Sequence, residues 1–420
     1  MSVAPEAPPT PAAPAPPRRR ISAPIILLAI AGLLLVLAVL RTLTGADDVA
    51  SSGTIAASIA AAIPIGLAGL GGLWAERAGV VNIGLEGMMI LGTLGAGYFG
   101  YFYDPWAGVV GAIVLGAVGG VIHAVATVSF GVDHIVSGVA INIIALGAVQ
   151  YLAALAFADE PGGGTSQSPS IDDLPTLTLS FLSDPLGDLE QRNWFFVSDA
   201  SAFLRALVTG MSSLTIISLA LFVLTWYVLW RTAFGLRLRS CGENPAAAES
   251  LGVNVYRYKF IAVAVSGGLA GLGGGFLAMV ASSTYRDGQT GGRGYIGLAS
   301  MIFGNWRPGG LLSGSLLFGY TDTVRLRSGG ESVHALLLLV AVLLVALAVW
   351  QWRNGQRGLA MVSVAIGVAA GVWFLLSDTV PGDFTSMTPY VATLLVLAMF
   401  SQRLRMPAAD GQRYRRGAAG

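Results

Sequence analysis

The sequence predicts an all-α polytopic membrane protein with about twelve transmembrane segments. Of its 420 residues, 54% are hydrophobic and only 11% are charged, whereas soluble domains carry about 25% charged residues. Runs of about 20 apolar residues, the length that crosses a bilayer as a helix, recur along the chain. Because lipid offers no hydrogen-bond partners to an exposed backbone, each run is expected to be a helix.

The order of apolar and polar stretches gives the expected domain layout. A Pro- and Ala-rich tail, 1–20, ends in three arginines and is expected to be disordered on the cytoplasmic side. A polar stretch, 158–206, separates the fifth transmembrane segment from the sixth, and a short Arg-rich tail, 404–420, follows the last one. The expected transmembrane segments are 21–40, 54–73, 80–103, 106–130, 135–157, 208–230, 259–281, 295–304, 308–325, 332–350, 359–377 and 388–403.

Arginine and lysine collect in the cytoplasmic loops of membrane proteins and therefore orient the segments. The stretch 158–206 contains eight acidic residues and only two arginines, so it is placed outside the cell. This topology requires 295–304 and 308–325 to be two separate segments, and it places both termini in the cytoplasm. The basic stretches placed inside are 74–79, 231–259, 305–308, 351–357 and 404–420.

An internal repeat supports this layout. The string GLAGLGG occurs at 66–72 and again, unchanged, at 268–274, and the string IGLxxM follows at 83–88 and at 296–301. In the expected topology the matched segments run in opposite directions, which is the pattern of an inverted-repeat transporter with its substrate path near the repeat interface. The alternative is a chance recurrence of small apolar strings, which are common in membrane helices.

The repeat divides the chain into two halves, 54–157 and 259–325. The segments within 332–377 have no counterpart in the first half and are interpreted as an added hairpin. A hairpin leaves the direction of the segments around it unchanged, so the inverted topology does not depend on it.

The stretch 231–259 lies between the halves and is a charged island in an apolar chain. Within it, Asn244 is a good N-cap, Pro245 suits the first helical position, and Gly252 can end a helix in the left-handed conformation. We therefore expect a short capped helix in a cytoplasmic loop, placed to meet a partner. The alternative is a solvated loop with a single helical turn.

No catalytic or metal-binding pattern appears in the sequence. The three histidines, His123, His134 and His334, are widely spaced, and neither HExxH nor CxxC occurs. Lys259 is the single lysine, which excludes a Walker A loop, so an ATP-driven mechanism would need its ATPase on another chain. Cys241 is the single cysteine, which excludes an intrachain disulfide. The net charge of +1 argues against a nucleic-acid role, and no cofactor is expected.

Polar residues inside apolar segments are the remaining candidates, because such residues are costly in lipid. Asn142 and Gln150 are eight residues apart and share one helix face. The structural alternative ties Glu86 to Arg77 or to backbone N–H groups, and lets the other side chains bond neighbouring helices. The residues expected to line a substrate path are Asn82, Glu86, Ser137, Asn142 and Gln150.

Five strings in this chain resemble the permease subunits of bacterial ABC importers. They are GLWAERAGVVNIGLEGMMILGT (72–93), GVDHIVSGVAINIIALG (131–147), SCGENPAAAESLGVNVYRYKF (240–260), SGGLAGLGGGFL (266–277) and GYIGLASMIFGNWRPGG (294–310). The resemblance covers roughly 54–325 and 388–403. It is nearest to the nucleoside and simple-sugar branch of the branched-chain amino acid and ribose permease superfamily.

The resemblance implies an inverted-repeat importer permease, which is a transmembrane subunit and not an enzyme. It would move nucleosides from a binding protein into the cytoplasm across the bacterial cell (inner) membrane, with simple sugars or branched-chain amino acids as alternative substrates. The implied partners are an ABC ATPase subunit, a second related permease that makes a heterodimer, and an extracytoplasmic substrate-binding lipoprotein. An ATP-independent channel or secondary transporter is the alternative from another class.

In permeases of this kind the loop between the halves carries the coupling helix that docks into the ATPase. The hairpin within 332–377 and the long stretch 158–206 depart from the usual permease pattern. Carried onto this chain, the coupling residues are Gly242, Glu243, Asn244, Pro245, Ala246, Ala247, Ala248, Glu249 and Gly252.

Overall fold

The computed structural model describes residues 23–327, 329–385, 387, 388, 391, 404–415 and 417 of the chain. Within this part the protein is helical apart from one small sheet, so the predicted all-α fold class is confirmed. In that sheet β1 (Thr176–Leu177) pairs antiparallel with β2 (Met211–Ser212).

Seven helices in the described part of the chain are long and apolar enough to cross a membrane. Each of them falls on a predicted apolar segment, and the chain is therefore a polytopic membrane protein. They are α2 (Ser52–Arg77), α4 (Pro105–Ala124) with its continuation to Ser129, α5 (His134–Phe157), α8 (Ser213–Arg231), α11 (Val255–Phe276) with its continuation to Ala281, α14 (Gly329–Arg353) and α15 (Arg357–Leu376).

Four further predicted segments are also helical. They form α1 (Ala23–Thr44), α3 (Leu85–Phe102), α12 (Arg293–Phe303) and α13 (Pro308–Arg327). As the topology requires, α12 and α13 are separate helices, and Asn305 and Trp306 in the turn between them have φ angles of 54° and 52°. The last predicted segment, 388–403, lies almost wholly outside the described residues, as does the tail 1–20.

The polar stretch 158–206 is not a plain loop. Together with the two strands, its helices form a polar cap (residues 158–212) on one end of the molecule. Two ion pairs of 2.9 Å fasten this cap: Arg41 of α1 to Asp199, and Arg205 to Glu190. The helices outside the spanning set are α6 (Ser180–Gln191), α7 (Val197–Ala206), α9 (Ala233–Glu243), α10 (Pro245–Ser250) and α16 (Gly382–Thr385), with a short 3-10 helix η1 (Asp47–Ala50).

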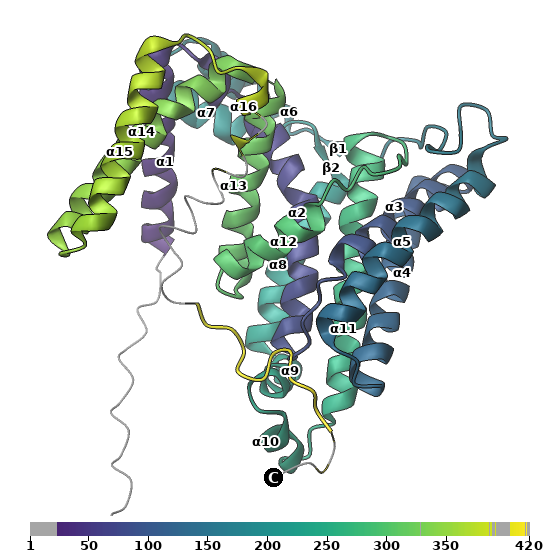
Figure 1. The fold of residues 1–420 in the computed structure, drawn as a ribbon. Helices are drawn as coiled ribbons and strands as arrows, with labels where there is room; N and C mark the ends of the chain where they lie inside the picture. Colours follow the sequence, from purple (N-terminus) through teal and green to yellow (C-terminus); the bar gives the residue numbers. More distant parts are fainter. Residues whose placement is uncertain are drawn as a thin grey trace, which may run out of the picture.

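The helices α2 and α11 run antiparallel at the centre of the molecule (Figure 1). Their contacts show the direction, because Gly71 lies against Ser266 while Gly273, further along α11, lies against Pro64. These two helices carry the two copies of GLAGLGG. The first, α2, packs on α12 and α13 of the other half, whereas α11 packs on α3 and α4. Equivalent helices therefore run in opposite directions and exchange partners, which supports the predicted inverted repeat.

Glycines allow the helices of these pairs to approach closely. A Cβ on Gly116 of α4 would lie 2.4 Å from the Gly267 carbonyl oxygen of α11. In the equivalent pair, a Cβ on Gly319 of α13 would lie 2.4 Å from the Ser58 carbonyl oxygen of α2. Small residues at such crossings bring the backbones together, and both halves use the same device.

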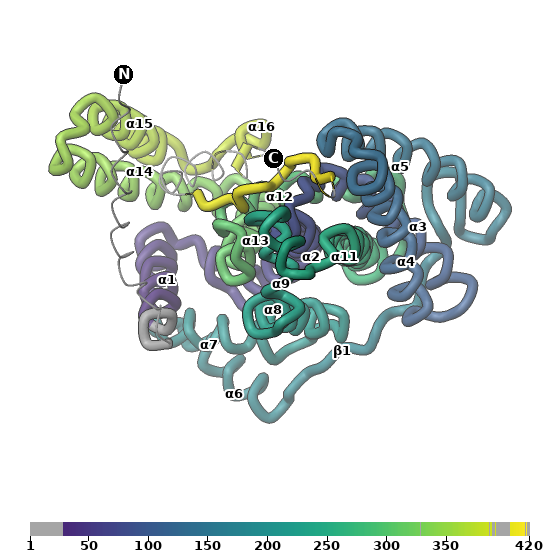
Figure 2. The backbone as a smooth tube through the Cα atoms, turned by 90° about the horizontal axis from the view of Figure 1, so that it is seen from below, coloured from purple at the N-terminus to yellow at the C-terminus, as the bar shows by residue number. Residues whose placement is uncertain are grey.

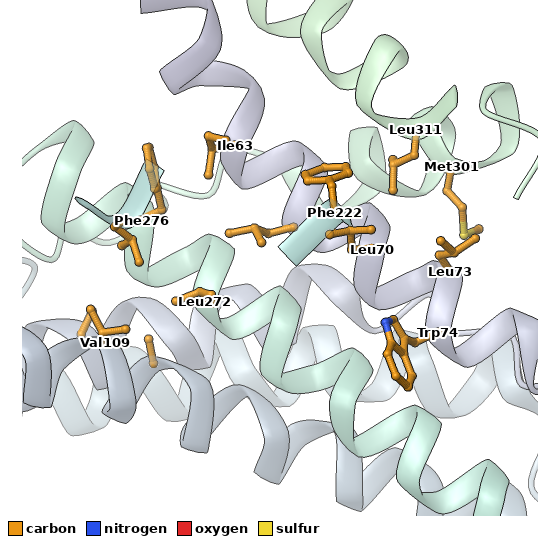
Figure 3. Close-up of a cluster of buried hydrophobic side chains, with 14 of the residues drawn as sticks. Ile63, Leu70, Leu73, Trp74, Val109, Phe222, Leu272, Phe276, Met301 and Leu311 are labelled. Atoms are coloured by element: carbon orange, nitrogen blue, oxygen red, sulfur yellow. The ribbon is translucent and has the colours of Figure 1, made fainter. Parts of the chain in front are cut away.

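The main hydrophobic core lies along α2 and joins both halves (Figure 3). Trp74 of α2 adds a hydrogen bond of 3.2 Å from its Nε1 to Thr225 of α8. Because this core draws on both copies of the repeat, its packing fixes how the halves sit on each other. Its labelled members are Ile63, Leu70, Leu73 and Trp74 of α2, Val109 of α4, Phe222 of α8, Leu272 and Phe276 of α11, Met301 of α12 and Leu311 of α13.

The added hairpin is present as α14 and α15 and lies to one side of the repeat core (Figure 2). The two helices pack mainly on each other, and Ser363 donates a hydrogen bond of 2.9 Å to Gln351 within the pair. Contacts from α14 to α1 and α13 attach the hairpin to the rest of the protein.

Replacing Gly116 by alanine is expected to lower the thermal midpoint of the purified protein. The added methyl group would meet the Gly267 carbonyl at 2.4 Å, and overpacking of this kind costs about 1–3 kcal/mol. Gly147 of α5 is the matched control, since nothing lies within 4 Å of the position of its Cβ. Thermal denaturation in detergent should separate G116A from G147A, and equal midpoints would contradict the close α4–α11 packing.

Candidate functional site

The chain leaves the helical conformation between α2 and α3, at residues 78–84, called the break below. The break packs against the middle part of α11, because Asn82 bonds to Ser266, eleven residues after the first residue of that helix. At 1.5 Å per residue this is about 16 Å along the helix. Backbone groups enclosed among membrane-spanning helices need partners inside the protein.

Side chains from three helices bind the backbone of the break. His123 of α4 lies, through Nε2, 3.0 Å from the Val81 carbonyl oxygen. Lys259 of α11 donates to the Gly79 carbonyl oxygen at 3.2 Å. The Val81 N–H donates to Nδ1 of His134, the first residue of α5, at 3.2 Å. His123, His134 and the single lysine of the chain therefore all form hydrogen bonds with the same short segment.

Asn82, itself part of the break, forms hydrogen bonds that hold the end of the break near α3 in place. Its side-chain oxygen accepts a hydrogen bond from the Gly84 N–H at 3.0 Å, and its amide donates to Ser266 Oγ at 2.8 Å. Nearby, Ser137 of α5 lies 2.9 Å from Nδ1 of His123 and so holds the ring that bonds to the break.

Asn142 of α5 joins the start of α3 to the other half of the protein. Its side-chain oxygen accepts from the Gly87 N–H at 2.7 Å. Its amide donates to the Ile83 carbonyl at 3.1 Å and to the Tyr295 hydroxyl of α12 at 2.8 Å. Both ends of this buried amide therefore have partners in the protein.

The Glu86 carboxylate caps α12, which belongs to the other half. It accepts from the Gly292 N–H at 2.9 Å and from the Gly294 N–H at 2.7 Å. Both N–H groups lie at the start of α12, where the helix dipole favours a negative charge. A Cβ on Gly294 would lie 2.8 Å from the carboxylate, so only glycine fits there. Of the structural alternatives for Glu86, backbone N–H groups hold it, whereas Arg77 pairs with Glu243 at 3.8 Å.

Four of the five predicted path residues meet at the break, and one does not. Asn82, Glu86, Ser137 and Asn142 are buried, with exposed fractions between 0% and 9%. Gln150 lies at the far end of α5 and donates to Asp287 at 2.7 Å. Direct contact of these residues with a substrate stays a prediction. Sequence reasoning missed Ser266 and Tyr295, although both stand in the family-like strings at 266–277 and 294–310.

The short capped helix predicted in the charged island is present as α10. Asn244 caps its start by accepting from the Ala247 N–H at 3.0 Å. At its end Gly252 is left-handed, with φ of 81°, and the Val253 N–H bonds to the Ala248 carbonyl at 3.0 Å. This is the Schellman arrangement, so the predicted cap and stop signals are both confirmed.

The sequence predicts a loop for the rest of the charged island. In the structure, much of it forms a second helix, α9. Thr232 caps it by accepting from the Gly235 N–H at 3.1 Å. Its inner face contains Leu238 and Cys241, both fully buried. Together with Phe234 they follow a helical spacing of four and three residues. This signal was present in the sequence, but it is short and interrupted by arginines.

The predicted coupling residues divide into an outer and an inner set. Ala246 and Ala247 are exposed, and beside them Leu251 is 84% exposed. Ala248 faces inward and packs against Cys241, whose thiol pKa burial raises to about 11. The outer residues make a small apolar surface at the tip of the molecule, and such exposed surfaces mark sites of interaction.

The other predicted coupling residues connect α9 and α10 to the core. A Cβ on Gly242 would lie 2.4 Å from the Arg77 carbonyl oxygen, so α9 rests directly on the end of α2. Glu243 reaches Arg77 as well, and Glu249 and Pro245 are half-buried. Over the described ranges, no group of three or more His, Cys, Asp or Glu side chains could hold a metal ion.

Comparison with known proteins shows which family this chain belongs to. Residues 54–349 match the model of the family described as "Branched-chain amino acid transport system / permease component". The chain belongs to this family. That range contains both halves of the repeat, the break and α9–α10, so these features are parts of a transmembrane permease subunit of an ATP-binding cassette importer.

Several individual permeases are similar over much of the chain. The guanosine ABC transporter permease protein NupQ of Bacillus subtilis is 32% identical over 86% of this chain and 96% of its own length. The nucleoside ABC transporter permease protein NupC of Lactococcus lactis is 32% identical over 84% and 93%. The putative glucose permease protein TsgC13 of Haloferax volcanii is 33% identical over 67% and 80%. A second Bacillus subtilis guanosine permease protein, NupP, is 25% identical over 61% and 69%. No solved structure matches the chain.

Replacing Glu86 by glutamine is expected to weaken the contact between the halves. The change removes the charge at the start of α12 and turns one acceptor into a donor that faces an N–H group. Hydrogen bonds to charged groups contribute about 1.5–3 kcal/mol, so the thermal midpoint of E86Q should fall. The same change at Glu331, which is exposed at the start of α14, is the control. If E86Q and E331Q have the same thermal midpoint, the Glu86 carboxylate does not stabilise the contact with α12.

Proposed function

We propose that this permease subunit imports nucleosides. Similarity carries the proposal: NupQ and NupC, whose names specify guanosine and nucleosides, are 32% identical over most of the chain. Simple sugars are the second candidate, because TsgC13 is named as a putative glucose permease, and its match covers a smaller share, 67%, of this chain. Branched-chain amino acids, which the family description names, are the third.

The charge balance at the break favours an uncharged substrate. The half-helices α3 and α12 both begin there, and helix starts carry partial positive charge that would attract an anion. The Glu86 carboxylate already occupies the start of α12 and lies in the first turn of α3. A neutral nucleoside or sugar therefore suits this region better than a phosphorylated one. In this proposal Asn82, Ser137 and Asn142 shape the path near the membrane centre, and Gln150 lies toward its outer end.

In the proposed importer a separate ABC ATPase drives transport and docks on α10. The single lysine of the chain excludes a Walker A loop, so ATP would be hydrolysed on another polypeptide. The outward residues Ala246, Ala247 and Leu251 are the surface offered to that partner. The buried Gly242 and Ala248 hold this surface in position. An ATP-independent channel or secondary transporter stays the alternative from another class.

The proposed assembly also contains a second permease and a binding lipoprotein. Two different guanosine permease proteins of Bacillus subtilis, NupQ and NupP, are similar to this chain, which supports a heterodimer. The acidic polar cap lies at the opposite end from α10 (Figure 1) and is the proposed outer docking face for the lipoprotein. Both termini would then lie in the cytoplasm of a bacterial cell, with the helices in its inner membrane.

Reconstitution of the chain with its partner permease, ATPase and binding protein tests the proposal. ATP-dependent uptake of radiolabelled guanosine is expected, and an excess of unlabelled nucleoside should suppress it while excess glucose or leucine should not. Glucose or leucine uptake without guanosine uptake would contradict the nucleoside assignment. Guanosine uptake that persists when the ATPase is left out would favour the channel or secondary transporter.

A further inference from the structure

Residues 404–415, called the C-terminal strap below, cross the face of the molecule that carries α9 (Figure 2, yellow). The strap begins at the α12–α13 turn, where the Arg405 N–H donates to Asn305 Oδ1 at 2.7 Å. It then meets α9, where the Ala409 N–H donates to the Gly242 carbonyl at 2.9 Å. The family match ends at residue 349, so the strap lies outside the part that defines the permease family.

The strap also covers the start of α11. The ring of Tyr414 lies 5.4 Å from that of Tyr256, and the Lys259 ammonium lies 6.0 Å from the centre of the Tyr414 ring. A Cβ on Gly79 would lie 3.2 Å from the Ala409 carbonyl oxygen. The strap therefore touches the break, α9, α11 and the turn after α12 at once. It joins both halves of the repeat to α9 and α10, which together are called the coupling unit below.

Asp410 is the unusual residue of this strap. Its side chain is buried, with 8% of the residue exposed, and neither carboxyl oxygen has a hydrogen-bond partner in the described part of the chain. It lies beside the buried carboxyl of Glu76 near the end of α2. An unpaired buried carboxylate is strongly unfavourable, and two adjacent carboxylates are more so.

The positively charged groups near Asp410 do not form an ion pair with its carboxylate, because they are bonded to other partners. Arg77, next to Glu76 on α2, is engaged by the Trp306 carbonyl at 2.7 Å and by Glu243. Lys259 of α11 is directed at Gly79 and Tyr414. Burial, followed by the neighbouring Glu76, raises the pKa of Asp410 well above its usual value, and the positive charge of Lys259 offsets this only in part.

We propose that Asp410 is a positioning residue for the coupling unit: it fastens the C-terminal strap against α9 and the break, and it does so only while it carries a proton. A protonated carboxyl can donate to Glu76, which removes the like-charge contact. When the proton leaves, the strap must either bury a second carboxylate or detach. The coupling unit is then held only by its own contacts to α2 and α11.

Proton linkage gives the direction of the effect. The closed strap binds the proton more tightly than the open strap, in which the pKa of an aspartate is about 3.9. Closure is therefore complete at low pH and is lost as pH rises toward the raised pKa of Asp410 in the closed strap. Between these values the opening constant grows by up to about tenfold per pH unit.

Hydrogen exchange on the full-length chain in lipid nanodiscs measures this opening. The protection factor of the Ala409 amide, which already allows for the intrinsic effect of pH on exchange, is expected to fall by up to about 100-fold between pH 6 and pH 8. D410N keeps a neutral donor at this position and should stay protected at both values. The control D172N makes the same change at an exposed aspartate of the polar cap and should behave like the unmodified protein. Protection in α2 and α11 serves as the check that each variant is folded.

Equal loss of protection in D410N and the unmodified protein, or no loss in either, would overturn the proposal. The link to coupling rests on the proposed function and has its own measurement, the pH dependence of ATP-driven uptake in the reconstituted importer. D410N is expected to retain uptake toward pH 8 relative to the unmodified protein. Unchanged uptake profiles alongside the expected exchange result would show that the strap closes without positioning the coupling unit, which also contradicts the proposal. An absence of any uptake in every variant, with the expected exchange result, would instead count against the proposed function.

Discussion

A backbone that leaves the helix among membrane-spanning helices must find its hydrogen-bond partners within the protein, and the rest of this structure depends on that constraint. Each backbone group left unsatisfied in such apolar surroundings costs several kcal/mol. The break at 78–84 obtains partners from α4, α5 and α11, through His123, His134 and Lys259. Because these helices come from both halves, satisfying the break also locks the halves together.

The same arrangement links the proposed coupling surface on α10 to the membrane core. Gly242 of α9 lies against the Arg77 carbonyl at the end of α2, one residue before the break begins. Beyond the break, Asn142 and Glu86 connect the start of α3 to α12. A displacement of α9–α10 thus meets the break directly and reaches both half-helices through specific hydrogen bonds. These bonds can break and re-form singly, and the glycine-lined helix crossings allow close sliding, which suits a transporter that alternates between states.

The parts of the structure that were predicted well from the sequence depend on local signals. The length of apolar runs located the spanning helices, and Asn244 with Gly252 located α10, because caps act over a few residues. The helix α9 was missed since its buried face, Leu238 and Cys241, is only two turns long and lies among arginines. The partners of Glu86 could not be read from the sequence. Its carboxylate was expected near Arg77 or backbone N–H groups, and those N–H groups lie about two hundred positions away, in α12.

The most direct test of this account asks which surface meets the ATPase. A cysteine introduced by A247C would lie on the exposed side of α10, whereas the native Cys241 is buried and its thiol pKa is raised, so it should react slowly. In the assembled importer, a short thiol-reactive photocrosslinker on A247C is expected to join the chain to the ATPase subunit, while the same reagent on D172C, in the polar cap, should not. Crosslinking to the ATPase from D172C and not from A247C would contradict the assignment of α10 as the coupling helix.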